Sequence, residues 1–255
     1  TLYELARIGV PSLGVCVADN QRRNLQEWQK LGFLENLGEY DDPSLFERLA
    51  SSMAKLDAFE IRRKMSDCGK ALVDGKGSTR VVKMLMSSLL KKAFSIRDAI
   101  SKDASCIFQI SNDDTVRSNS FHPEKITWDK HLEWFTKRLN DNNCEFFVAE
   151  LNGEIYGQVR FDIDENKNEA SVSISVKEDI RGLGMGVYML DEAVDILNRK
   201  RRDIRLIKAY IKGENMRSAA VFEKAGFSYA GRTDINGQNA KIYTKEILSA
   251  EVQKT

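Results

Sequence analysis

The stretch Asp179-Ile180-Arg181-Gly182-Leu183-Gly184-Met185-Gly186-Val187 decides how the second half of this 255-residue chain folds. Before it, residues 170–176 alternate small polar and apolar side chains with a period of two, as in a strand with one buried face. After it, apolar residues recur at helical spacing in a segment that ends in the basic run 199–202. The glycines therefore occupy a turn between a strand and a helix.

This turn predicts a site for a phosphate or pyrophosphate. The first turn of a helix leaves backbone N–H groups unpaired at a positive helix end, and glycine lets an anion approach the backbone closely. A Walker loop would need Gly-Lys-Ser/Thr, whereas the chain has Gly186-Val187-Tyr188. A Rossmann fingerprint needs a wider spacing than that of Gly182, Gly184 and Gly186. A tight turn without any ligand stays an open alternative.

A second motif lies downstream of the glycine turn. Arg181-x-x-Gly184-x-Gly186, followed by residues 211–227 with Asn215 and Gly226, resembles the acetyl-coenzyme A signature of the GNAT N-acetyltransferases. Two motifs in the family's order are more specific than one. The resemblance covers about residues 94–247 and implies an α/β GNAT fold, with a mixed, largely antiparallel sheet flanked by helices, in a domain of residues 93–250.

The sequence pattern predicts the elements of such a domain. We expect helices over residues 104–111, 127–139 and 215–225, besides the long helix that the glycine turn opens. Asn152-Gly153 predicts a tight hairpin turn, and Gly226 the end of the last helix. The expected strands cover residues 94–97, 145–150, 155–162, 170–176, 204–211, 228–232 and 241–246.

The resemblance implies acetyl-CoA as the cofactor and suggests how it binds. The N–H groups of the glycine turn would bind the pyrophosphate, the strand edge at 174–176 would pair with the pantetheine amides, and Asn215 would contact the pantetheine arm. Lys212, Arg217 or Lys224 would meet the 3′-phosphate, although each could equally be a solvated surface cation. The residues expected at the cofactor are Ile174, Val176, Arg181, Gly182, Leu183, Gly184, Met185, Gly186, Val187, Asn215 and Ser218.

The chemistry implied is direct attack of an amine on the thioester, which needs a base for the amine and an acid for the thiolate. Two positions depart from the family pattern. Phe222 stands where many members have a tyrosine acid, and Ser171 lies near the position of a common glutamate. Candidate substitutes by proximity are Glu169, Ser218, Tyr210 and Tyr243.

The acceptor side is expected in residues 111–135, which are polar, rich in hydrogen-bonding groups and interspersed with aromatics. This stretch resembles acetyltransferases that act on amino groups of nucleotide-linked deoxyamino sugars. Each of the two histidines could instead be structural, and no cysteine lies at metal-ligand spacing, so we expect no metal site. The predicted acceptor-binding residues are Asn112, Arg117, His122, His131 and Trp134.

Residues 1–88 are expected to form a separate domain. A helix, the strand 13–17 and a further helix predict a small parallel βα unit. The segment resembles the C-terminal part of the UDP-sugar hydrolase of pseudaminic acid synthesis, a partial Rossmann-like subdomain of the GT-B type. The resemblance places Glu4 on a nucleotide ribose, and Asn20 and Gln21 near sugar and phosphate; capping and surface roles stay open for all three. We therefore expect part of a longer fusion, with an inactive hydrolase portion before the acetyltransferase.

Composition is that of ordinary globular domains, with 42% hydrophobic and 30% charged residues. The net charge of +1 provides no broad electrostatic footprint, so we expect neither nucleic acid nor a membrane as partner. The four cysteines are scattered and no run of about 18 apolar residues occurs, which indicates a cytoplasmic protein. A homo-oligomer is left open.

The predicted activity is acetyl transfer to the 4-amino group of a UDP-linked 4-amino-4,6-dideoxy-2-acetamido sugar, a nucleotide-linked aminosugar of pseudaminic acid biosynthesis. The hydrolase-like segment favours this acceptor, because fusing consecutive steps would shorten transfer between them. Two alternatives stay open: a protein N-terminal acetyltransferase of the ribosomal-protein type, and a non-catalytic module that binds CoA or a nucleotide sugar, which Phe222 suggests.

Overall fold

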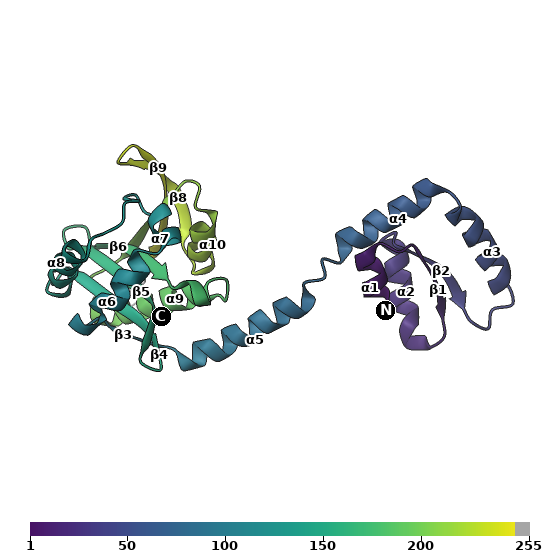
Figure 1. Ribbon diagram of the computed structural model, residues 1–255, viewed down its shortest axis with the longest axis horizontal. Helices are drawn as coiled ribbons and strands as arrows, with labels where there is room; N and C mark the ends of the chain where they lie inside the picture. Colours follow the sequence, from purple (N-terminus) through teal and green to yellow (C-terminus); the bar gives the residue numbers. More distant parts are fainter. Residues whose placement is uncertain (248–255) are drawn as a thin grey trace, which may run out of the picture. The chain divides into compact units, whose positions relative to one another are not determined.

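The computed structural model describes residues 1–247 and divides into two compact units, the first from Thr1 to Val82 and the second beginning at Lys83 (Figure 1). The division falls within α5 (Gly77–Ala93). The predicted domains, 1–88 and 93–250, place the boundary slightly later, and the predicted end at residue 250 lies outside the described residues. Each unit has its own hydrophobic cluster and is described by itself.

The first unit is built on two parallel strands. The elements are α1 (Leu2–Ile8), β1 (Ser12–Cys16), α2 (Asp19–Lys30), β2 (Leu34–Glu39), α3 (Leu45–Leu56) and α4 (Phe59–Leu72). β1 and β2 pair in parallel, as the sequence pattern predicts. The assignment of this unit to UDP-sugar hydrolases stays a prediction. The core consists of Ala6, Cys16, Leu25, Trp28, Phe33 and Leu34.

The second unit is built on a seven-stranded sheet of order β3-β4-β5-β6-β7-β9-β8. Only β6 and β7 pair in parallel within the described sheet, and the other neighbours are antiparallel. This confirms the mixed, largely antiparallel sheet. The strands are β3 (Ser95–Asp98), β4 (Cys144–Leu151), β5 (Glu154–Asp164), β6 (Glu169–Val176), β7 (Leu206–Lys212), β8 (Ser228–Ile235) and β9 (Gln238–Glu246).

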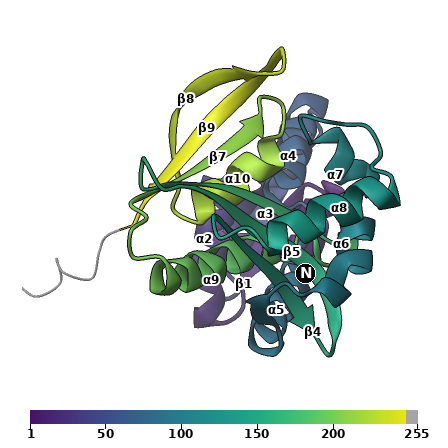
Figure 2. The same cartoon turned by 90° about the vertical axis from the view of Figure 1, so that its left-hand side faces the viewer.

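Helices cover both faces of this sheet (Figure 2). Because side chains alternate along a strand, β4 directs Phe147 and Ala149 to the cluster that contains α9, and Phe146 and Val148 to the cluster of α6 and α8. The helices are α6 (Ala104–Ser111), α7 (Asp114–Ser118), α8 (Trp128–Leu139), α9 (Met185–Lys200) and α10 (Met216–Lys224), with short 3-10 turns η1 (Ser101–Asp103) and η2 (Glu178–Ile180).

The local turn chemistry agrees with the sequence. Asn152 and Gly153 have φ of 52° and 81°, which is the left-handed pair that a two-residue hairpin turn requires. Gly226, with φ of 81°, comes directly after Ala225, the C-cap of α10. Across residues 1–247, no helix combines the length and the apolar character needed to cross a membrane.

Candidate active site

The three glycines of the turn before α9 serve different structural needs. Gly182 and Gly184 have φ of 75° and 76°, a backbone conformation that residues with a Cβ rarely adopt. Gly186 lies inside α9, where an added Cβ would lie 3.4 Å from a methyl group of Val221 on α10. That distance is an ordinary van der Waals contact, so Gly186 lies at the α9–α10 contact, while Gly182 and Gly184 shape the turn.

The turn presents backbone N–H groups at the start of a 16-residue helix. Gly184 is the N-cap of α9, and no side chain caps this end within the described part of the chain. Met185 is fully buried, so only its backbone is available to a ligand, whereas Gly182 and Gly184 are exposed. Unpaired N–H groups at a positive helix end suit a phosphate or pyrophosphate.

Beside this turn, the two parallel strands separate. Pairing between β6 and β7 ends at Val172 and Ala209, although β6 continues to Val176 and β7 to Lys212. β5 remains paired with β6 as far as Val176, and β9 remains paired with β7 as far as Lys212. Each strand therefore keeps its outer partner and has a free inner edge over the last residues.

The free edge of β6 belongs to Ile174 and Val176. Lys177 N donates to Tyr156 O on β5 at 2.7 Å, and successive residues of a strand direct their backbone groups to opposite edges. Ile174 and Val176 consequently present N–H and C=O groups away from β5. An extended ligand with amide groups can add to such an edge by strand-type hydrogen bonds.

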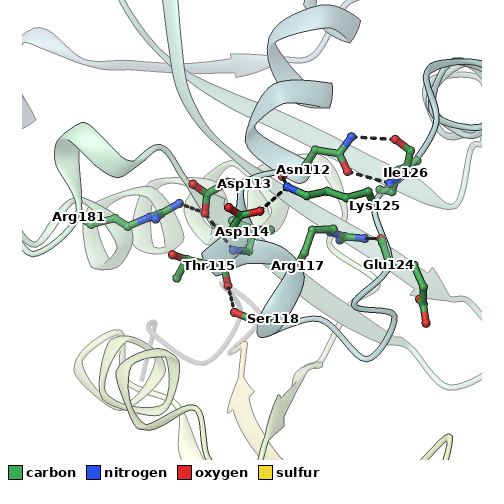
Figure 3. A network of polar contacts seen from close by, with 11 residues as sticks. Asn112, Asp113, Asp114, Thr115, Arg117, Ser118, Glu124, Lys125, Ile126 and Arg181 are labelled. Atoms are coloured by element: carbon green, nitrogen blue, oxygen red, sulfur yellow. Dashed lines mark hydrogen bonds and ion pairs between the residues drawn. The ribbon is translucent and has the colours of Figure 1, made fainter.

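Arg181 closes one end of this free edge. Its Nε donates to Val176 O at 2.9 Å. Its Nη2 donates to Asp113 Oδ1 at 2.7 Å (Figure 3). Burial acts to raise the pKa of Asp113, but the Arg181 guanidinium and the Val116 N–H outweigh it and lower that pKa below its ordinary value. The side chain of Arg181 therefore supports the site instead of being free for a ligand.

The second motif places Asn215 at the N-cap of α10. Its Oδ1 accepts a hydrogen bond from Ser218 N at 3.0 Å, so the amide nitrogen is the part of this side chain left for a ligand. Arg217 and Lys224 are exposed on α10. Lys212 Nζ instead donates to Ser118 O at 2.9 Å.

The structure does not gather the proposed acids and bases into one cluster. Glu169 begins β6, at the end farthest from the glycine turn, and pairs with Lys208 Nζ at 2.6 Å. Tyr210 is largely exposed, and Phe222 is buried against Phe227 with ring centroids 5.1 Å apart.

Tyr243 lies at the level where β6 and β7 part, because it pairs with Ala209. Its Oη donates to Glu223 Oε1 at 3.0 Å. Burial, followed by this bond to Glu223, raises the pKa of Tyr243. The hydroxyl is thus an uncharged hydrogen-bond donor at neutral pH, although the raised pKa makes it a weaker acid than a free phenol.

The predicted acceptor segment forms a closed loop over residues 112–126. The side-chain amide of Asn112 bonds both backbone groups of Ile126, at 2.8 and 2.9 Å. Arg117 Nη1 donates to the carbonyl groups of His122 and Glu124, at 3.1 and 3.4 Å (Figure 3). Asn112 and Arg117 therefore shape the loop from within.

This loop also docks on the C-terminal strands. Gln238 Nε2 donates to Phe121 O at 3.0 Å, and His122 Nε2 lies 3.3 Å from Asn236 Nδ2. Together with the bond from Lys212, these contacts tie the loop to β7 and to the β8–β9 hairpin. The loop is thus brought close to the strand that borders the free edge of β6.

His131 and Trp134 lie in an aromatic cluster. His131 is 1% exposed, its Nε2 bonds Ala104 O at 2.9 Å, and its ring stacks on Phe135. Burial lowers the pKa of His131. Arg160 lies 5.0 Å from the Trp134 ring centroid. His131 is therefore placed as a structural residue, which is the alternative to acceptor binding given for it above. It has no contact with β6 in the described residues.

In the first unit, the three predicted nucleotide contacts lie at helix starts. Glu4 and Asn20 are exposed, and Gln21 Oε1 accepts a hydrogen bond from Val17 N at 3.1 Å. That bond connects the end of β1 to the start of α2 and uses the amide oxygen of Gln21. Over residues 1–247, no group of three or more His, Cys, Asp or Glu side chains could hold a metal ion.

One residue that the sequence reasoning did not single out is Asp113. Its carboxylate caps α7 through Val116 N at 3.0 Å and also binds Arg181. Aspartate is a common N-cap residue, so the sequence offers a signal for the cap. It offers none for the ion pair, which joins residues 68 positions apart. Only the fold reveals it.

Comparison with known proteins places these motifs in one family. Residues 104–227 match the model of the acetyltransferase (GNAT) family. The putative phosphinothricin acetyltransferase YwnH of Bacillus subtilis (strain 168) is 32% identical over 138 residues, which are 51% of this chain and 80% of the relative.

Solved structures agree with the fold. A putative phosphinothricin N-acetyltransferase is 30% identical with a TM-score of 0.51, over 60% of this chain and 98% of that one. The spermidine N-acetyltransferase of Vibrio cholerae, in complex with CoA and spermine, is 22% identical with a TM-score of 0.54, over 61% of this chain and 96% of that one. At that identity, the second match supports the fold alone.

Proposed function

Because this chain belongs to the GNAT family of acetyltransferases and is thus an enzyme that transfers an acetyl group from acetyl-CoA to an amine, we propose a specific acceptor. This is the 4-amino group of a UDP-linked 4-amino-4,6-dideoxy-2-acetamido sugar, on the path to pseudaminic acid.

One observation carries the donor site: the free edge of β6 lies beside the uncapped start of α9. The pantetheine amides would pair with Ile174 and with the N–H of Val176, since the Val176 carbonyl is taken by Arg181. The pyrophosphate would lie on the N–H groups that follow Gly184. The Asn215 amide nitrogen would reach the pantetheine arm from α10.

The reaction forms an N–C bond and breaks the C–S bond of the thioester. The attacking amine loses a proton to a base or a water chain, and the departing thiolate takes one from an acid. We assign the acid to Tyr243, because it pairs with Ala209 at the level where β6 and β7 separate and carries a hydroxyl group that can donate a proton. Glu169 is engaged by Lys208, which makes it a weaker candidate for the base.

The acceptor assignment rests on the charge of the loop. Arg117 and Lys212 donate to backbone carbonyl groups and form no ion pair with a carboxylate among the described residues. Both cations therefore keep charge for a phosphate. A loop of hydrogen-bonding side chains with such cations suits a sugar linked to a diphosphate.

The first unit supports the same acceptor through its resemblance to a UDP-sugar hydrolase. Glu4, Asn20 and Gln21 would then be remnants of a nucleotide site. The scattered, unpaired cysteines of the described chain are consistent with a cytoplasmic location.

A second candidate acceptor is a small amino acid that carries an anionic group. The 32% identical relative is named as a putative phosphinothricin acetyltransferase, and phosphinothricin combines an amine with a phosphinate. The cations Arg117 and Lys212 would suit that anion as well as a diphosphate. Relative rates on the two amines decide between the candidates.

The test is release of free thiol from acetyl-CoA by the purified chain. The arms are the UDP-aminosugar, phosphinothricin and a panel of N-terminal peptides. A UDP-sugar with a hydroxyl group in place of the 4-amino group is the matched control. We expect the highest kcat/KM with the UDP-aminosugar and none with the control. Turnover confined to phosphinothricin or to peptides would overturn the sugar assignment and leave the acetyltransferase assignment intact.

A further inference from the structure

We propose that Asp113 is a positioning residue that couples the cofactor turn to the acceptor loop through Arg181. The inference rests on the proposed function, because it takes the glycine turn as the site of CoA. The coupling is carried by one oxygen atom. Asp113 Oδ1 accepts from Arg181 Nη2 at 2.7 Å and from Val116 N at 3.0 Å, so it joins the turn before α9 to the first turn of α7 (Figure 3).

On the cofactor side, Arg181 touches the edge that the pantetheine would use. Its Nε donates to the carbonyl of Val176, the last residue of β6. Arg181 is followed in the chain by Gly182, which has a left-handed backbone. The Arg181 side chain is only 25% exposed, and the Asp113 side chain 26%. A partly buried ion pair with a charge-assisted hydrogen bond has a defined geometry, unlike a pair of solvated side chains.

On the acceptor side, α7 continues into the loop that we assign to the substrate. Arg117, one residue after Val116, holds two carbonyl groups of the loop, and Ser118 O accepts from Lys212 of β7. A displacement of Asp113 therefore moves both cations proposed to meet the acceptor anion. The chain of contacts is continuous from the free edge of β6 to these cations.

The consequence is reciprocal coupling between the two ligands. Binding of CoA fixes the glycine turn, hence Arg181, hence the start of α7, and an ordered loop in turn favours CoA by the same factor. Because the coupling is mutual, loss of Asp113 should remove the CoA-dependent protection of the acceptor loop and change CoA affinity by no more than the coupling factor itself.

The chain offers a close set of variants. Asp113→Asn keeps an oxygen that caps α7, because asparagine is as good an N-cap as aspartate, but it removes the charge that pairs with Arg181. Asp114→Asn is the matched control. Asp114 belongs to the same loop and pairs with Lys125 at 2.5 Å, without contact to the glycine turn.

The experiment uses the full chain and coenzyme A alone as the probe. Amide hydrogen exchange of residues 113–118 is followed with and without CoA, and the CoA dissociation constant is measured by calorimetry. For the unmodified chain and for Asp114→Asn, we expect CoA to slow exchange in α7 at least about fivefold. For Asp113→Asn, we expect this slowing to disappear while the dissociation constant rises by no more than the factor by which CoA slows exchange in the unmodified chain.

Retained slowing in Asp113→Asn, or an equal loss in Asp114→Asn, would overturn the coupling. CoA that binds the unmodified chain without slowing exchange in α7 would do the same. A chain that does not bind CoA at all would instead overturn the proposed function, and the inference would fall with it.

Discussion

Val172 of β6 lies opposite Ala209 of β7, and this is the last paired position between the two parallel strands in the described residues. Beyond it, both backbone groups of Ile174 and the N–H of Val176 lack a strand partner next to the glycine turn, whereas the Val176 carbonyl is bonded to Arg181. Unpaired backbone groups need a partner, and an extended amide ligand provides one without any specific side chain. This explains how a donor site can be built from main chain, so that few side chains mark it in the sequence.

Replacing Gly184 by valine should weaken CoA binding by at least about tenfold. Its φ of 76° disfavours a residue with a Cβ, at a cost of about 1–2 kcal/mol, and the added side chain obstructs the N–H groups of α9. Gly153→Val is the matched control, because Gly153 has φ of 81° and open space around it in the β4–β5 turn. Calorimetry with CoA checks this. Equal affinity in both variants would mean that the phosphate site lies elsewhere.

Replacing Tyr243 by phenylalanine should lower kcat by about 100-fold, within the usual range for loss of a general acid or base, with CoA affinity unchanged. The residue loses only the hydroxyl that donates to Glu223. Tyr229→Phe, on the neighbouring strand β8 and exposed, should keep full activity. Steady-state kinetics and CoA titration separate the two parameters. An unchanged kcat in Tyr243→Phe would transfer the acid role to water or backbone groups.

Introducing a hydroxyl group by Phe222→Tyr should not raise kcat. Phe222 is 3% exposed and packs edge-on against Phe227, so the new hydroxyl would be buried. Without a partner, it should destabilise the fold by about 1–3 kcal/mol. Urea unfolding measures this cost, and thiol release measures kcat. A rise in kcat would show that position 222 faces the departing sulfur, as the tyrosine of related proteins is expected to do.

His131 should make the fold less stable in mild acid. Burial lowers its pKa from the ordinary 6.5, so below that pH the unfolded chain takes up a proton that the folded chain does not. The contribution is fully present above about pH 6.5 and is lost as the pH falls towards the folded pKa, by at most about 1.4 kcal/mol per pH unit.

The check is urea unfolding of three chains between pH 7.5 and pH 5. The His131→Phe variant should have a flatter pH profile of the unfolding free energy than the unmodified chain, whatever its absolute stability. His122→Gln, a change in the exposed loop, should leave the profile as it is. Parallel profiles for His131→Phe and the unmodified chain would contradict the burial of a neutral imidazole.

The sequence predicts the second unit well because its signals are local. The alternation in β6, the helical spacing after Gly186 and the Asn152-Gly153 turn each depend on residues a few positions apart. The short α7 is not expected, because Asp114-Thr115-Val116-Arg117-Ser118 has no apolar periodicity and depends on the Asp113 cap.

Relationships between distant segments are what the sequence does not reveal. The pair Arg181–Asp113 and the docking of Lys212 on Ser118 depend on how β6, α7 and β7 assemble. For the same reason, the acidic and basic candidates were chosen by proximity in the sequence. The fold instead separates Glu169 from the glycine turn and brings Tyr243 to the last pair of the parallel ladder.

The most direct test of the donor site is amide exchange at single residues of β6, measured by NMR with and without acetyl-CoA. We predict that acetyl-CoA slows exchange of the Ile174 and Val176 amides and of the amides of residues 185–187. The amide of Val159, on the inner strand β5, is the internal reference and should not change. If saturating acetyl-CoA leaves Ile174 and Val176 exchanging as before, the pantetheine does not bind along β6.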